Sequence, residues 1–99
     1  MDNYFSILNS IYYKIDKQKI ELFCNFLKNG INGGYIFCIG NGGSASTATH
    51  FVNDVSLGSR QFEKPFRAIS LCDNKAVITA IANDDGYENI FLQKIQTDA

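Results

Sequence analysis

Residues 35–50 read YIFCIGNGGSASTATH, an apolar run that passes directly into a glycine-rich turn and then into small polar residues. A short, continuous apolar run is typical of a strand in a parallel sheet, where helices cover both faces. Glycines end this run, and residues 44–57 can continue as a helix with its Ala and Val side chains, and Phe51, on one side. The stretch therefore predicts a strand, a glycine turn and a helix, which together begin a parallel α/β fold.

Two amphipathic helices are expected before this strand. Apolar side chains recur at helical spacing over residues 5–15 and again over residues 20–27. Asp16 stands between the two runs, where its carboxylate can cap the second helix. Gly30 supplies the stop, so residues 1–30 are expected to form a helical segment of their own.

A second strand and two more helices are expected after the first strand and its helix. Residues 66–72 form another short apolar run, and Asp73 and Asn74 can cap a helix behind it. Residues 83–86, NDDG, break that helix, and a last helix is expected over residues 87–96. Strands that alternate with helices are joined by right-handed crossovers, so the two strands should be parallel. A parallel pair is too small to stand alone, and we therefore expect the N-terminal part of a larger fold.

The composition excludes several classes of function. With 99 residues, 45% of them apolar, the chain forms one domain at most. A formal charge of −1 gives no general attraction for nucleic acid or for an anionic membrane, so any anionic ligand must be held locally. No apolar run approaches the roughly 20 residues of a membrane span. Three widely spaced cysteines suit reduced packing residues in a cytoplasmic protein better than disulfides.

The glycine turn lies where parallel α/β folds bind phosphates, beyond the C-terminal end of a strand. Glycines let a backbone approach a ligand closely, and free amides at the start of the following helix attract an anion. The hydroxyls of Ser44, Ser46 and Thr47 would add hydrogen-bond donors. The turn is therefore a candidate phosphate site.

A glycine turn after a strand has three other interpretations: a Walker-type P-loop, a dinucleotide-binding turn, or a turn that binds no ligand. A Walker-type P-loop is excluded because no lysine occurs between Lys28 and Lys64. A dinucleotide fingerprint is formally met by Gly40, Gly42 and Ala45, but the acidic residue expected about 20 positions later is missing. A glycine turn that binds nothing stays open as the third alternative.

His50 and Asp54 are four residues apart on the helix that follows the turn, so their side chains share one face. The pair could ligate a divalent metal or serve as acid and base, whereas a lone histidine can also be purely structural. His50 is the only histidine in the sequence, so a metal site with three histidine or carboxylate ligands must draw on other residues.

Three motifs occur in a distinctive order: GNGGSA at residues 40–45 with HF at 50–51, AISL at 68–71, and AIANDDGYE at 80–88. Their order and spacing resemble the sugar isomerase (SIS) superfamily and, within it, the phosphoheptose isomerases. The likeness runs from about Ile20 to the end of the chain. It implies an α/β fold with a parallel sheet flanked by helices in three αβα layers, of which this chain would hold the N-terminal helices and the first two strands.

The resemblance implies a cytoplasmic, homotetrameric enzyme. Such an enzyme converts sedoheptulose 7-phosphate to D-glycero-D-manno-heptose 7-phosphate, an aldose–ketose isomerisation that supplies lipopolysaccharide or capsule biosynthesis. Residues 1–30 would be the oligomerisation segment, packed between subunits, and residues 35–99 would begin the αβα sandwich. The family's second phosphate loop and the Gln and His that complete its metal site are expected beyond Ala99.

Site residues follow from the same resemblance. His50 matches a zinc ligand, and Asp54 matches a glutamate that is both a zinc ligand and the catalytic base, although Asp54 is one methylene shorter. The implied catalytic residues are thus Asp54 and His50, and the implied cofactor is Zn²⁺. The residues implied to contact the sugar phosphate are Asn41, Gly42, Gly43, Ser44, Asp54, Asn83 and Asp84.

Two further functions stay open at this stage. A SIS fold can also serve as a non-catalytic module that senses a phosphosugar or docks on a protein partner. A dinucleotide-binding fragment is the third hypothesis, and it predicts affinity for NAD that a heptose phosphate does not displace.

Overall fold

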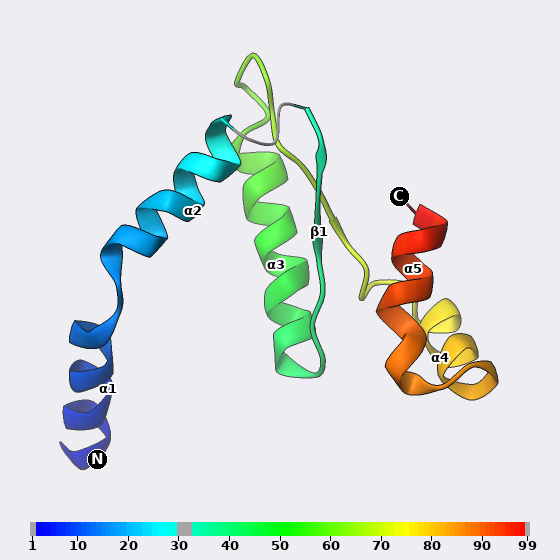
Figure 1. The fold of residues 1–99 in the computed structure, drawn as a ribbon, viewed down its shortest axis with the longest axis horizontal. Coiled ribbons are helices and arrows are strands. Elements are labelled where there is room, and N and C mark those ends of the chain that lie inside the picture. Colours follow the sequence, from blue (N-terminus) through cyan, green and yellow to red (C-terminus); the bar gives the residue numbers. More distant parts are fainter. Residues whose placement is uncertain (1, 30–32, 99) are drawn as a thin grey trace. The chain divides into compact units, whose positions relative to one another are not determined.

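The fold was analysed in a computed structural model, which describes residues 2–29 and 33–98. The chain divides into two compact units, Met1–Asn32 and Gly33–Ala99. Figure 1 shows the order of the elements along the chain.

The first unit consists of two helices, α1 (Asp2–Lys14) and α2 (Lys17–Asn29). Asp16 caps α2 as the sequence predicts, because its Oδ1 accepts hydrogen bonds from the backbone N–H groups of Gln18 (3.0 Å) and Lys19 (3.3 Å). The stop predicted at Gly30 lies outside the described residues. No described residue of either helix is buried, so the apolar faces of α1 and α2 are open to solvent.

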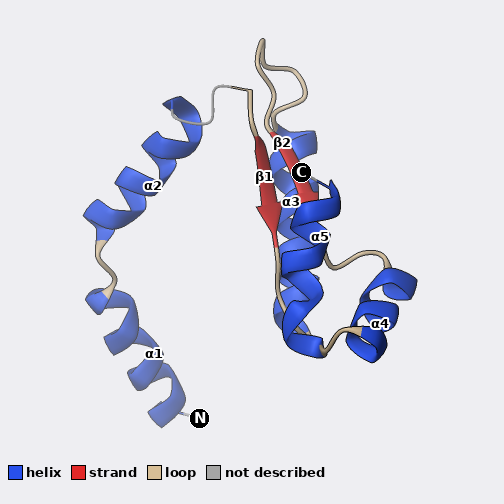
Figure 2. Ribbon diagram, turned by 45° about the vertical axis from the view of Figure 1, so that its right-hand side comes forward, coloured by secondary structure: helices blue, strands red, loops and turns tan. Residues whose placement is uncertain are grey.

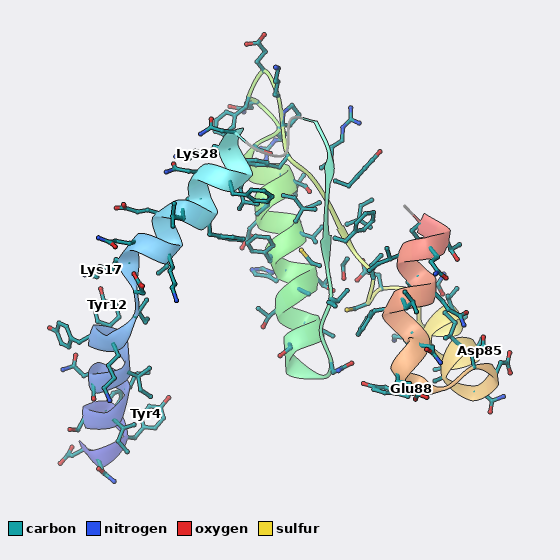
Figure 3. The ribbon with its side chains drawn as sticks, viewed as in Figure 1. Tyr4, Tyr12, Lys17, Lys28, Asp85 and Glu88 are labelled. Atoms are coloured by element: carbon teal, nitrogen blue, oxygen red, sulfur yellow. The ribbon has the colours of Figure 1, made fainter. Side chains whose placement is uncertain are left out.

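The Lys17 ammonium lies over the ring of Tyr12, 5.8 Å from its centroid, at the junction of α1 and α2 (Figure 3). A cation above the face of an aromatic ring is attracted by the ring's quadrupole. At an exposed site such a contact is weak.

The second unit begins with the predicted parallel pair, β1 (Tyr35–Cys38) and β2 (Arg67–Ser70). Tyr35 pairs with Arg67 and Cys38 with Ser70, so the C-terminal ends of both strands lie at the same edge (Figure 2). Both strands are shorter than the apolar runs that predict them. The Leu71 N–H still donates to the Cys38 carbonyl at 3.0 Å, which continues the pairing one step past β2.

Helix α3 (Gly43–Gly58) connects the two strands and packs on both of them. Ala48 is its buried residue, which agrees with the predicted inner face. Phe51 was expected on that face but is 37% exposed, and Ser56 lies there instead, half-buried, with its hydroxyl 3.5 Å from the Ala68 carbonyl. No residue of β1 is fully buried, so the expectation of a strand covered on both faces is wrong for the described residues.

Ser59 closes the end of α3 and holds the loop that leads to β2. Its hydroxyl donates to the Val55 carbonyl at 2.7 Å and accepts from the Phe66 N–H at 2.9 Å. Ser59 is only 3% exposed, whereas residues 60–65 between the two anchor points are exposed. The base of this loop is therefore fixed by one buried side chain.

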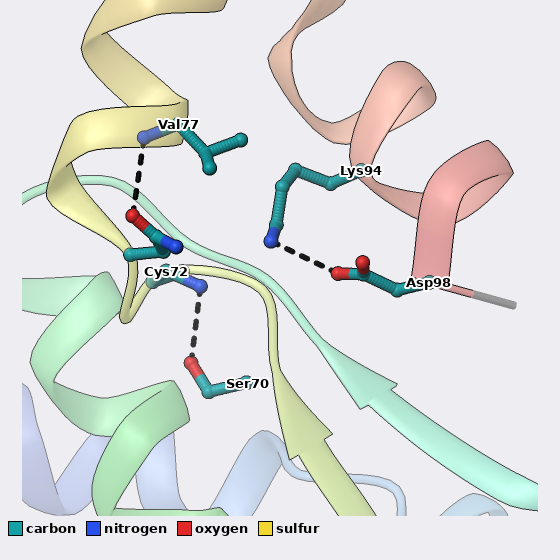
Figure 4. Close-up of polar contacts among 6 residues, drawn as sticks. Ser70, Cys72, Val77, Lys94 and Asp98 are labelled. Atoms are coloured by element: carbon teal, nitrogen blue, oxygen red, sulfur yellow. Dashed lines mark hydrogen bonds and ion pairs between the residues drawn. The ribbon is translucent and has the colours of Figure 1, made fainter.

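The rest of the unit is α4 (Lys75–Asp84), the 3₁₀ turn η1 (Tyr87–Asn89) and α5 (Ile90–Asp98). Asn74 caps α4 as predicted, because its Oδ1 accepts from the Val77 N–H at 3.1 Å (Figure 4). Residues 83 and 84 belong to α4, so the predicted break at 83–86 begins later, at Asp85. Lys94 Nζ and Asp98 Oδ2 of α5 are 2.9 Å apart and form an ion pair (Figure 4).

Within residues 2–29 and 33–98, the helices are all too short or too polar to cross a membrane.

Candidate functional site

The turn between β1 and α3 is shaped by two glycines. Gly42 precedes the first residue of α3 and has φ 56°, a left-handed conformation that side chains other than glycine rarely adopt. Gly40 lies so close to the helix that a Cβ added to it would meet the Ser44 carbonyl carbon and oxygen at 2.5 Å. The backbone of the turn is therefore pressed against the start of α3.

The backbone amides of the turn divide into two groups. The N–H groups of Ser44 and Ala45 donate to the Asn41 and Gly42 carbonyls at 2.9 and 3.1 Å, and that of Ser46 donates to the Gly42 carbonyl at 3.3 Å. The prediction of free amides is wrong for these three, because the chain winds into α3 immediately. The amides of Asn41, Gly42 and Gly43 have no partner among residues 2–29 and 33–98, so the free donors lie earlier in the turn.

The hydroxyls expected beside the turn also differ in availability. The Thr47 hydroxyl donates to the Gly43 carbonyl at 3.1 Å, so it serves the helix and not a ligand. The exposed Ser44 and Ser46 hydroxyls make no such bond within the described part of the chain. Ser44 stays a candidate contact for an anion at the turn.

Asn41 is tied to a distant element. The Tyr87 hydroxyl, in η1, donates a 2.6 Å hydrogen bond to Asn41 Oδ1 across 46 positions of sequence. Because the oxygen of the Asn41 amide accepts this bond, its NH₂ group is left as the donor.

His50 and Asp54 lie on one face of α3, as the sequence predicts. His50 Nε2 and Asp54 Oδ2 are 3.7 Å apart, and both side chains are well exposed. His50 comes seven residues after Gly43, which at 1.5 Å per residue is about 10 Å along the helix axis. His50 therefore lies about two helical turns beyond the glycine turn, and Asp54 about three.

The separation of this pair suits two ligands of one metal ion. Nitrogen and oxygen ligands of tetrahedral zinc, each about 2.0–2.1 Å from the metal, lie roughly 3.3 Å apart. A small side-chain adjustment would bring the two atoms from 3.7 Å to that distance. No third His, Cys, Asp or Glu joins them among the described residues, so the pair by itself does not make a complete metal site.

A groove of about 560 Å³ runs beside His50. Its wall combines residues of α3 with one residue that follows β2. The lining residues are Ala45, Ser46, Thr49, His50, Asn53 and Cys72.

A chain of hydrogen bonds fixes one wall of this groove. The Thr49 hydroxyl donates to Asp73 Oδ1 at 2.8 Å and lies 3.2 Å from the Ser70 hydroxyl. Ser70 Oγ in turn accepts from the Cys72 N–H at 3.2 Å (Figure 4). One turn of α3 is thereby held to the end of β2.

Two cysteines, Cys38 and Cys72, lie half-buried beside the turn. The Cys72 thiol lies 3.3 Å from the Gly40 carbonyl and donates to it. Burial raises the pKa of the Cys38 thiol, and the neighbouring Cys72 raises it further. The three cysteines are free thiols, as the sequence predicts, but Cys24 is exposed, so the prediction of a packing role is wrong for Cys24.

Asn83 and Asp84 lie at the end of α4, where Asn83 Nδ2 donates to Asp84 Oδ1 at 3.1 Å. In the described part of the chain no hydrogen bond or ion pair joins either residue to residues 41–44, His50 or Asp54. The structure therefore brings together the turn and, separately, the His50–Asp54 pair, and it leaves Asn83 and Asp84 unconnected to both.

Sequence reasoning missed three contributors to the site: Tyr87, Thr49 and Asp73. Tyr87 stands in the AIANDDGYE motif, which was the one signal that could have drawn attention to it. Thr49 and Asp73 are ordinary polar residues whose pairing depends on how α3 packs on β2, and no local pattern marks them.

Comparisons with known proteins agree on one family. The chain is 40% identical over 80 residues to the phosphoheptose isomerase of Helicobacter pylori (strain P12), an alignment that covers 81% of this chain and 40% of that protein. It is 32% identical over 97 residues to the probable phosphoheptose isomerase of Thermoplasma volcanium, covering 97% of this chain and 50% of the relative.

A solved structure supports the same relationship. Phosphoheptose isomerase from Neisseria gonorrhoeae superposes with a TM-score of 0.58 at 31% sequence identity, over 81% of this chain and 39% of that one. No protein-family model matches the chain. The chain spans half or less of the length of these relatives. Over the part of these relatives that it spans, the chain is similar in sequence and in fold to the phosphoheptose isomerases.

Proposed function

We propose that this chain supplies one part of the active site of a phosphoheptose isomerase, which converts sedoheptulose 7-phosphate to D-glycero-D-manno-heptose 7-phosphate. The observation that supports it most is the pairing of His50 with Asp54, 3.7 Å apart on the helix that the glycine turn opens. The free amides of Asn41, Gly42 and Gly43, with Ser44, bind oxygens of the sugar phosphate at that turn.

The reaction moves a carbonyl between C2 and C1 of the sugar. A base removes the proton next to the carbonyl and returns it to the neighbouring carbon, through an enediol whose oxygen carries negative charge. The Asp54 carboxylate carries out this transfer. The open position of Asp54 on α3, with its side chain 63% exposed, leaves room for a substrate carbon beside it.

Zn²⁺ is the proposed cofactor, with His50 and Asp54 as two of its ligands. A bound zinc ion supplies Lewis-acid stabilisation of negative charge on an oxygen. The imidazole and carboxylate donors suit zinc, and the remaining ligands come from outside the described residues.

The assembly, location and wider role belong to the same proposal. Helices α1 and α2 form the oligomerisation segment of a cytoplasmic homotetramer, which is supported by apolar faces with no buried residue. Asn83 and Asp84 contact the substrate from the end of α4. The product serves lipopolysaccharide or capsule biosynthesis.

Substitution of Asp54 tests this function. In the full-length protein that carries this chain, Asp54→Asn should lower kcat for sedoheptulose 7-phosphate by about 10² to 10⁴-fold, the usual contribution of a general base. Asp54→Glu keeps the carboxylate, so its kcat should stay much closer to that of the wild type than the kcat of Asp54→Asn does. Glu63→Gln removes an exposed carboxylate in the loop before β2 and is the matched control.

Three outcomes are decisive. Full turnover in Asp54→Asn would contradict the assignment of the base. A wild-type protein that binds the sugar phosphate and contains no zinc, yet gives no turnover, would favour the non-catalytic SIS module. Binding of NAD that sedoheptulose 7-phosphate cannot displace would favour the dinucleotide-binding fragment.

A further inference from the structure

Tyr87 makes the longest-range side-chain hydrogen bond in the described part of the chain, and it makes this bond to a residue of the glycine turn. Its hydroxyl donates to Asn41 Oδ1 at 2.6 Å, across 46 positions. The contact joins η1, at the far side of α4 in sequence, to the end of β1. Among the side-chain hydrogen bonds of residues 2–29 and 33–98, it is the one that connects residues 80–88 to the turn.

The backbone that carries Tyr87 is held firmly. Gly86 has φ 101°, and a Cβ there would meet the Glu88 carboxylate at 2.8 Å, so a side chain at this position would strain the turn. Asn89 closes the turn twice: its N–H donates to the Gly86 carbonyl at 3.1 Å, and its Nδ2 donates to the Asp85 carbonyl at 2.7 Å. Asp85 and Glu88 mark this turn in Figure 3. The backbone of Tyr87 is therefore held in a hydrogen-bonded turn.

The bond determines what Asn41 can offer a ligand. A side-chain amide has one oxygen acceptor and one NH₂ donor group, and rotation by 180° exchanges them. With its oxygen held by the Tyr87 hydroxyl, Asn41 has its NH₂ group left to donate, in the same turn as the free amides of Gly42 and Gly43. All of these groups are donors, which is the arrangement that a phosphate or sugar oxygen requires.

We propose that Tyr87 is a positioning residue, which holds the Asn41 amide in the orientation that donates to the sugar phosphate. The proposal rests on the proposed function for the identity of the ligand, and on the hydrogen bond alone for the orientation of Asn41. Tyr87 is 58% exposed, so water competes for its hydroxyl and the expected effect is moderate.

The test is a double-substitution cycle in the full-length protein that carries this chain. Tyr87→Phe removes only the hydroxyl and should raise KM for sedoheptulose 7-phosphate about two- to fivefold, the lower part of the range for one hydrogen bond, with kcat within twofold. In an Asn41→Ala background the same substitution should change KM by less than about 1.5-fold, because Tyr87 then has nothing to orient. Tyr35→Phe, equally conservative and at a similarly exposed tyrosine (55%) at the start of β1, is the matched control.

A second measurement needs no ligand. In the ¹⁵N-labelled full-length protein, Tyr87→Phe should shift the Asn41 side-chain NH₂ resonances, and Tyr35→Phe should leave them in place. Unmoved resonances, or an equal KM change with and without Asn41, would overturn the positioning role. A wild-type protein that does not bind sedoheptulose 7-phosphate would overturn the proposed function instead, and the NMR measurement would still decide whether Tyr87 orients Asn41.

Discussion

Gly40 shows how one residue fixes the geometry of the turn. A methyl group at this position would lie 2.5 Å from backbone atoms of Ser44 and 2.8 Å from the Ala45 nitrogen. Backbone atoms cannot rotate aside as a flexible side chain can, so either the strand end or the helix start must move. Gly58, at the other end of α3, has nothing within 4 Å of the same construction and provides a comparison.

Gly40→Ala should therefore loosen the start of α3. We expect a local cost of about 1–3 kcal/mol, typical of forced overpacking, seen as faster amide hydrogen exchange at residues 45–48. Gly58→Ala should leave these rates unchanged or slow them slightly, since alanine favours the helix. Equal rates in wild type and Gly40→Ala would show that the turn accommodates a side chain.

The cysteines should differ in reactivity in a way that the structure explains. The thiolate is the reactive form, and burial together with Cys72 raises the pKa of Cys38, so less thiolate is present there at any pH below that pKa. Cys24 is exposed on α2. At pH 8, iodoacetamide should alkylate Cys24 faster than Cys38, as measured by mass spectrometry of the peptides. Faster alkylation of Cys38 would contradict its burial.

At the scale of elements, the caps and the strand pairing could be predicted, and the links between elements could not. Asp16 and Asn74 cap helices through bonds to residues two or three positions away, which a sequence pattern reveals directly. The bond from Thr49 to Asp73 spans 24 positions, and that from Tyr87 to Asn41 spans 46. Such bonds depend on tertiary packing. The same reason explains Phe51, whose helical spacing suggested the inner face although it is exposed.

The Thr49 hydroxyl should matter more to the packing of α3 on β2 than to the helix itself. Thr49→Val keeps the shape of the side chain but removes the hydrogen bonds to Ser70 and Asp73. The Ser70 hydroxyl and the Asp73 carboxylate each lose one hydrogen-bond partner. We expect a loss of about 1–3 kcal/mol in local stability, measured as faster hydrogen exchange of the β2 amides. The control is Thr79→Val, because the Thr79 hydroxyl bonds only to carbonyls of its own helix.

At the scale of the whole molecule, few apolar side chains are buried. Among the described residues the buried apolar side chains are Ala48, Leu71 and Ile90. Large apolar residues in both units are more than one-third exposed, including Phe26 of α2 and Phe62 of the loop before β2. The apolar content of the sequence is enough for a small core, and nothing in its pattern predicted that so few side chains would be buried.

The chain studied alone should consequently bind the dye ANS strongly and unfold over a broad temperature range. Exposed apolar surface binds the dye, and a small core gives little cooperativity. The full-length phosphoheptose isomerase from Neisseria gonorrhoeae, measured in parallel, should bind less dye per residue and unfold more sharply. A sharp transition with little dye binding by this chain would contradict the small core.

The parallel register has a consequence for how this family can change its length. Each strand residue advances the chain by about 3.3 Å and points to the opposite face from its neighbour, so deleting one residue from β1 would displace Gly40 and invert the side chains before it. Residues 60–65 form the exposed loop whose base is held by the two hydrogen bonds of the Ser59 hydroxyl. A residue added to this loop leaves the pairing of β1 with β2 unchanged. Insertions and deletions among related sequences should therefore be common in that loop and rare between β1 and α3.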